Sequence, residues 1–433
     1  MSNATTLRRT FPLCHALLAP VRWLMKTWRR IGVLVAVILA VVAAIPIWWV
    51  IQLAGLPDIG DPFDVAAFRA AAIPDDRNAF VLYRQAAALF RPLKGRNMTL
   101  GPPGTHPPRW PMLNREAREW VEANRDALAL CRRAAERPEA LVPAPGFEQE
   151  YAEFGRIDSL QSLILIEATR LEQEGDMAGA WSWYRTHCRT ASLIGSRGTT
   201  YRRYRALAWQ VMLLKRLTEW AADPRTSPEQ VRQALDVMIE CAAIVPSDSY
   251  TLKADYLEVE GLSQGWDRLN NGQPPGWFRF VKEHDIPLTV EQIQAIGAAV
   301  RFWRREPERC RRLARLLVAN RLAFYDLPPD RRPEPDPSVL TQNLFSFGPE
   351  APSKACVLAP DRLDRWLDTT ADLRGLNNFF TWKRLQVAEA DHRQALVISL
   401  ATELYRRDHK ADPPTPEALV GPYLKSLPAA PPE

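Results

Sequence analysis

The sequence predicts a mainly α-helical protein, in which one N-terminal transmembrane helix is followed by an outer domain of antiparallel helical hairpins. We expect these hairpins to pack as a bundle or as an irregular solenoid. Three observations lead to this fold class. Residues 31–57 form an uncharged apolar run, apolar residues recur at helical spacing through most of the remaining chain, and the alternating β-branched segments that build a sheet are missing from the sequence.

The apolar run at residues 31–57 has the length of a membrane-spanning helix. A bilayer core of about 30 Å needs roughly 20 apolar residues, and the run contains no Asp, Glu, Lys or Arg. Pro46 predicts a kink, which membrane helices tolerate. The alternative interpretation is a cleaved signal peptide, although the apolar region of such peptides has only about 7 to 15 residues.

Charges on the two sides of this run predict its orientation. Residues 1–30 carry six Lys and Arg and no acidic residue, whereas the exit side opens with Asp58, Asp61 and Asp64. Because Lys and Arg beside a membrane helix stay in the cytoplasm, we expect a single-pass signal-anchor protein of the cell membrane. Residues 1–30 would form a basic cytoplasmic tail, residues 58–433 would lie outside the cytoplasm, and the lipid bilayer would be a partner.

The net charge of +6, from 56 basic and 50 acidic residues, is accounted for by the N-terminal tail. The outer part is neutral and has no general field to attract a polyanion, so nucleic acid is not an expected partner. The stretch YRRYR at residues 201–205 is a local exception. Its arginines and tyrosines are suited either to stacking and pairing with a polyanion or to a solvated helix face, and helical spacing favours the solvated face.

Prolines divide the outer part of the chain. We expect an α-helical domain at residues 58–325 with a Pro-rich loop at 94–114, a Pro-rich linker or long loop at 326–352, and a C-terminal helical segment at 353–433 that ends in a YLKSLP tail.

Capping residues and helical spacing place the individual helices. Asp75 or Asp76 is expected to cap a helix that includes Phe80 and Ala87. Asn114 is expected to cap a second helix, which reaches Ala135. Apolar periodicity on both sides of the break at residues 175–176 predicts a helical hairpin over residues 151–194. Other helices are expected at 201–221, 228–243 behind a capping box, 250–266, 289–303, 308–325, 361–373 and 382–407.

One hairpin carries a family resemblance. Leu171, Gly175, Asp176, Ala180 and Tyr184 resemble the turn and second helix of a tetratricopeptide unit, in which a small alanine packs closely on the partner helix. The resemblance covers about one unit. Generic antiparallel helix packing is the alternative to a tetratricopeptide solenoid.

The two ends of the outer part carry a second resemblance. The tail from Leu404 to Pro428 and the phrase from Gly60 to Tyr83 resemble segments of uncharacterised single-pass membrane-anchored helical proteins of planctomycete-type bacteria. That resemblance implies no activity. The tail is also similar to the C-terminal part of type II secretion major pseudopilins, but it reads Pro428-Ala429-Ala430-Pro431 and lacks the Asp-Pro of those proteins.

Motifs for phosphate binding, dinucleotide binding, zinc proteolysis and serine hydrolysis are missing from the sequence. We therefore predict no catalytic, cofactor-binding or metal-binding residue. His284 lies between Glu283 and Asp285, and His392 follows Asp391. Solvated charge on a helix face is the simpler interpretation of both clusters, and metal binding or acid–base chemistry with distant partners is the alternative.

The outer cysteines are too sparse for a disulfide-rich scaffold and contain no C-x-x-C pair. We expect them to be small buried residues, with one or two disulfides as the alternative. They are Cys131, Cys188, Cys241, Cys310 and Cys356.

Two hypotheses about function remain. The first is a membrane-tethered extracytoplasmic helical interaction or scaffold protein, whose outer domain binds a protein partner. The second is an extracytoplasmic enzyme with an acidic and histidine site that the sequence alone does not reveal. A single pocket that collects several of a set of titratable residues would favour the enzyme. That set comprises Asp255, Glu258, His284, Asp391 and His392.

The anchor is tested by tags at both ends of the full chain. If residues 31–57 are retained as a membrane helix, N-terminal and C-terminal tags remain together on one full-length product in the membrane fraction. Loss of the N-terminal tag from that product would show cleavage and contradict the anchor.

Overall fold

The computed structural model describes residues 58–92, 109–142, 147–264, 306–325 and 379–427, with scattered positions between Trp28 and Ile47 that are helical. This part of the chain is mainly α-helical, as the sequence predicts. Within it, no helix has both the length and the apolar character needed to cross a bilayer. Most of the predicted membrane segment at 31–57, the tail at 1–27, the loop residues 93–108 and the linker at 326–352 lie outside the described residues.

The chain forms two compact units, one of residues 59–269 and 313–433 and another of residues 1–58 and 270–312. The first unit contains almost all of the described helices. Its core is a single buried cluster of aliphatic and aromatic side chains.

The predicted hairpin at 151–194 is present as α6 (Phe147–Glu174) and α7 (Met177–Ser196). Gly175 makes the turn at φ 86°, a left-handed conformation that glycine adopts without steric cost. The Asp176 side chain then accepts a 2.8 Å hydrogen bond from the Gly179 amide and so caps α7. The buried residues Ile157, Leu160 and Ile164 hold α6 in the core.

The chain returns through α8 (Thr200–Ala222) and α9 (Pro228–Ala243). Helices α7 and α8 approach closely at Gly195, where an added Cβ would lie only 3.1 Å from the Cβ of Ala206. A residue without a side chain allows this approach. The boundary of α9 follows from the predicted capping box, in which Ser227 and Gln230 bond each other's backbone amides in both directions.

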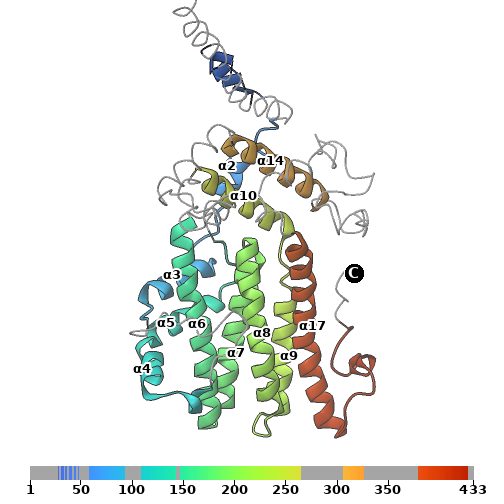
Figure 1. The fold of residues 1–433 in the computed structure, drawn as a ribbon. Coiled ribbons are helices and arrows are strands. Elements are labelled where there is room, and N and C mark those ends of the chain that lie inside the picture. The colour runs from blue at the N-terminus through green and yellow to red at the C-terminus, as the bar shows by residue number, and fades with distance from the viewer. Residues whose placement is uncertain are drawn as a thin grey trace, which may run out of the picture. The chain divides into compact units, whose positions relative to one another are not determined.

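The last long helix, α17 (Phe379–His409), packs on both α8 and α9. Helices α8 and α9 barely touch each other, so α17 occupies the place that α9 would take in a simple hairpin stack. Helices α7, α8, α17 and α9 thus contact in a closed ring, which is a bundle arrangement (Figure 1). The segments on either side of the Pro-rich stretch at 326–352 therefore share one core.

Arginine side chains form hydrogen bonds between α17 and the α8 segment at two levels along the helices. Near the start of α8, Arg203 donates to both carboxylate oxygens of Glu389, with Nε 2.9 Å from Oε1. Near its end, Arg407 of α17 donates to the carbonyls of Ala221, Asp223 and Thr226. The two levels are separated by eighteen residues on α8 and by eighteen residues on α17, which is about 27 Å at 1.5 Å per residue. The two helices therefore run parallel and in register.

A smaller group of helices packs against α6 and α7: α3 (Ala79–Leu89) and α5 (Arg125–Ala135), preceded by α2 (Val65–Ala70), η1 (Trp110–Met112) and α4 (Arg115–Ala123). Asn114 caps α4 as predicted, by accepting from the Ala117 amide at 2.9 Å, but the single helix expected to reach Ala135 is divided at Asn124 into α4 and α5. The cap of α3 is Asn78 rather than Asp75 or Asp76. The Asn78 side chain also bonds the backbone of Leu141, so it joins α3 to the segment after α5.

Two further helices, α10 (Asp248–Gln264) and α14 (Glu306–Tyr325), match their predicted positions. The C-terminal tail contains η4 (Pro416–Leu419), with Pro416 at its first position. Leu419 and Leu424 are buried in the common core, and the ring of Tyr423 lies edge-on to Tyr405 of α17.

Among the described cysteines, Cys131, Cys188 and Cys241 are buried free thiols, which agrees with their predicted role as small core residues. Burial raises the pKa of Cys131 to about 12, so its thiol stays protonated and unreactive near neutral pH. The Cys188 thiol donates to the Met238 sulfur at 3.4 Å.

His187 of α7 is fully buried, and its Nε2 lies 2.9 Å from the carbonyl oxygen of Trp209 on α8. A carbonyl only accepts, so Nε2 carries the proton of the neutral ring. Burial lowers the pKa of His187 from 6.5 to about 4, against the opposing effect of the Trp209 hydrogen bond. The imidazole is therefore a neutral core group at physiological pH.

His187 predicts a loss of stability in acid. Between pH 6.5 and about pH 4 the unfolded chain binds a proton at this ring and the folded chain does not, so the free energy of unfolding falls by about 3 kcal/mol as the pH decreases. Urea denaturation of the full chain at pH 7 and pH 4 measures this loss. In the His187→Gln variant, the decrease in the free energy of unfolding between the two pH values should be about 3 kcal/mol smaller than in the wild type. Parallel losses in the wild type and the variant would contradict the assignment.

Candidate functional site

The acidic residues singled out on α10 serve the fold. Asp255 accepts hydrogen bonds from the backbone amide and the hydroxyl of Thr200, and so binds the first residue of α8. Glu258 is one turn further along α10. Burial raises the pKa of Glu258 to about 7, the charge of Asp255 adds to this effect, and the charge of Arg202 opposes it.

The acid–histidine cluster on α17 does not form a joined pair. Asp391 is exposed, while His392 is half-buried with Nδ1 2.9 Å from the Ala388 carbonyl of its own helix. The buried member of the cluster is Glu389, which pairs with Arg203. The other cluster, around His284, lies outside the described residues.

The YRRYR stretch is the clearest correction to the sequence interpretation. A solvated face was the expected arrangement, but Arg202 and Arg203 are only 1% and 2% exposed, whereas Tyr201 and Tyr204 are 36% and 46% exposed. The guanidinium of Arg202 lies over the Phe154 ring at 5.0 Å. Arg203 binds Glu389 and, at 2.8 Å, Asp248. Both arginines are therefore structural.

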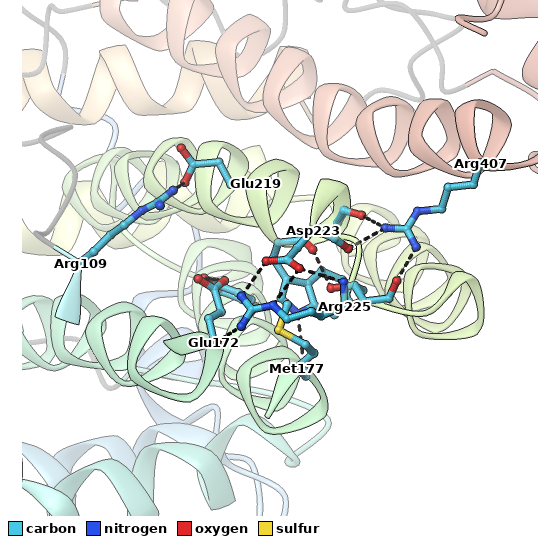
Figure 2. Close-up of polar contacts among 11 residues, drawn as sticks. Arg109, Glu172, Met177, Glu219, Asp223, Arg225 and Arg407 are labelled. Carbon is cyan, nitrogen blue, oxygen red and sulfur yellow. Dashed lines mark hydrogen bonds and ion pairs between the residues drawn. The ribbon is translucent and has the colours of Figure 1, made fainter. Parts of the chain in front are cut away.

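A polar network joins the helix turns at one end of the bundle (Figure 2). Arg225 in the α8–α9 turn donates to the carbonyl of Glu172 at 2.9 Å and pairs with Asp223, while the Trp220 indole donates to the Met177 carbonyl at 3.1 Å. Figure 2 also shows Arg407 reaching this turn from α17. The network ties the α6–α7 turn to the α8–α9 turn and to α17.

Glu172 and Tyr184 are the most acid–base-like pair in this region. The Tyr184 hydroxyl donates to Glu172 Oε1 at 2.6 Å. Burial raises the pKa of Glu172, although Tyr184 and Arg109 oppose the rise, and burial together with the Glu172 charge raises the pKa of Tyr184 well above its usual value. The Tyr184 hydroxyl therefore stays protonated near neutral pH and donates to Glu172, and this contact joins the two arms of the α6–α7 hairpin.

A groove of 630 Å³ lies where α5, α6 and α7 meet, and we call it the α5–α7 groove. Its size is in the range of about 300–1,000 Å³ typical of binding sites. Helix α6 contributes Glu167 and Arg170, and α7 contributes Trp183. The α5 side supplies Arg125, Leu128, Ala129, Arg132, Arg133 and Glu136.

The charges in the α5–α7 groove fall into two groups. The Arg170 guanidinium is engaged by Glu167, at 2.8 and 2.7 Å, and by Glu174 at 2.5 Å. By contrast, Arg132 and Arg133 are exposed and form no ion pair with any described residue. Arg132 lies over the ring of Trp183, with its guanidinium carbon 5.6 Å from the ring centroid. Two arginines therefore remain available to a ligand.

Sequence reasoning missed the α5–α7 groove, although the sequence contains a signal for one wall. Arg125, Ala129, Arg132 and Glu136 are spaced by four, three and four residues, so they form one stripe along α5. The facing side chains Arg170 and Trp183 come from two other helices, and no spacing within the sequence brings them to this stripe.

No family model, curated protein or solved structure that was compared matches this chain. Over the ranges that the structure describes, no group of three or more His, Cys, Asp or Glu side chains is arranged to hold a metal ion. What the α5–α7 groove offers chemically is recognition of an anionic group by guanidinium donors beside an aromatic ring.

Proposed function

We propose that this protein is a membrane-tethered helical interaction protein that binds a protein partner through the α5–α7 groove. In this proposal residues 31–57 span the cell membrane, residues 1–30 lie in the cytoplasm, and the helical unit lies outside it. The lipid bilayer and the protein ligand are its two partners, and nucleic acid is not one. The uncharged run and the basic residues before it support the topology.

The observation that carries the binding role is the contrast between the groove and the rest of the polar side chains. Arg203, Arg407 and Asp255 are used to fix helices to one another. In the groove, exposed Arg132 and Arg133 and half-buried Trp183 line a hollow that the fold itself does not fill. Arginine and aromatic side chains grouped in this way are typical of binding surfaces.

The enzyme hypothesis has less support from the described residues. The groove is lined by none of Asp255, Glu258, Asp391 and His392. Asp255 holds the start of α8, and Asp391 lies on the exposed side of α17.

A pull-down from solubilised membranes tests the proposed function. The tagged full chain should return a stoichiometric partner, and Trp183→Ala should reduce its recovery about tenfold, a cost of about 1.4 kcal/mol, because it removes part of the groove wall and the ring on which Arg132 lies. Tyr204→Ala is the control for loss of an aromatic side chain outside the groove, and helical circular dichroism checks that Trp183→Ala, whose ring packs on the core, remains folded. A pull-down without a stoichiometric partner, or equal recovery by both variants, would contradict the proposal.

A further inference from the structure

We propose that the α5–α7 groove binds an extended acidic segment of the partner protein, whose carboxylates pair with Arg132 and Arg133. This inference rests on the proposed function and specifies the chemistry of its ligand.

The charge of the groove suits an acidic ligand. The groove is lined by four arginines and two glutamates. Both glutamates are already paired, Glu167 with Arg170 and Glu136 with Arg185 at 2.9 Å, whereas Arg132 and Arg133 present open guanidinium groups. A guanidinium binds a carboxylate through two parallel hydrogen bonds. The complementary ligand therefore carries at least two acidic groups.

A third cation can be recruited at the end of the stripe. Arg125 pairs with Glu122, with Nε 2.6 Å from Oε2, but both side chains are largely exposed, at 61% and 46%. Exposed pairs of this kind contribute only about 0–1 kcal/mol. A ligand carboxylate can therefore displace Glu122 at small cost.

The shape of the groove suits an extended chain. The stripe on α5 from Arg125 to Glu136 rises through eleven residue steps, or about 16 Å of helix. An extended peptide rises about 3.3 Å per residue, so about five residues fit along this wall. Buried Leu128 and the small Ala129 lie between the charged positions, which leaves room for a backbone to approach.

Two features of the groove favour a peptide over a nucleic acid. Bases bind single-strand sites by stacking on aromatic faces, but the guanidinium of Arg132 already lies over the face of Trp183. Glu136 and Glu167 also face the groove and would repel a continuous phosphate backbone. A short segment with spaced carboxylates avoids both conflicts.

The test is fluorescence anisotropy with labelled pentapeptides and the purified full chain in detergent. A peptide with alternating Asp and Glu residues should bind, and its affinity should fall as salt increases. The matched Asn and Gln peptide should bind at least tenfold more weakly. Equal binding of the acidic and amide peptides, or tighter binding of an oligonucleotide of similar length, would overturn the inference.

A pair of double variants locates the binding. Arg132→Gln with Arg133→Gln should weaken the acidic peptide at least tenfold. Lys215→Gln with Lys425→Gln removes the same two charges from exposed positions outside the groove and should leave binding unchanged. Helical circular dichroism checks that each variant is folded. Equal effects of the two double variants would overturn the inference.

The two proposals can fail separately. If the pull-down partner depends on Trp183 but the acidic peptide does not bind, the acidic ligand is wrong and the binding role of the groove stands. If the acidic peptide binds through Arg132 and Arg133 but no stoichiometric partner is recovered from membranes, the ligand chemistry stands and the proposed function fails.

Discussion

The arrangement of the helical unit depends on one buried ion pair, between Arg203 of α8 and Glu389 of α17. These residues are 186 positions apart in the chain, are 2% and 4% exposed, and share Asp248 as a third member. Burial alone would lower the pKa of Arg203, but its hydrogen bonds to Glu389 and the nearby carboxylate charges raise it overall. The guanidinium is therefore charged, and it determines which face of α17 turns towards α8. The apolar residues Leu400 and Leu404 then complete the core.

Burial also distinguishes the arginines that hold the helices together from the arginines that are available to a ligand. Inside the bundle, Arg202 lies on an aromatic ring and Arg407 binds the turn after α8. Removing the contacts of either guanidinium would leave a desolvated charge uncompensated and would lower the free energy of unfolding. In the α5–α7 groove, neutral substitutions of Arg132 and Arg133 should cost the fold little free energy, because both side chains are exposed and form no ion pair with a described residue. The zero net charge of residues 58–433 conceals this division, because it counts buried and exposed arginines equally.

The sequence predicted what local chemistry determines. The Gly175 turn, the Asn114 cap and the Ser227–Gln230 capping box lie where they were expected, because these interactions join residues close in the chain. The position of α17 and the facing walls of the groove depend on contacts between distant segments, which periodicity does not specify. The burial of Arg202 could have been predicted from the sequence, because this residue lies one helical turn before Ala206 and continues the apolar stripe of α8.

A double-mutant cycle on Arg203 and Glu389 tests the central role of the buried pair most directly. Free energies of unfolding are measured for the full chain with Arg203→Met, with Glu389→Met and with both. Each single change leaves a buried charge without its partner and should cost about 3–5 kcal/mol, whereas the double change should cost at least about 2 kcal/mol less than the sum. Costs that add to within about 0.5 kcal/mol would contradict the central role of the pair, because they would show that the two charges stabilise the bundle independently.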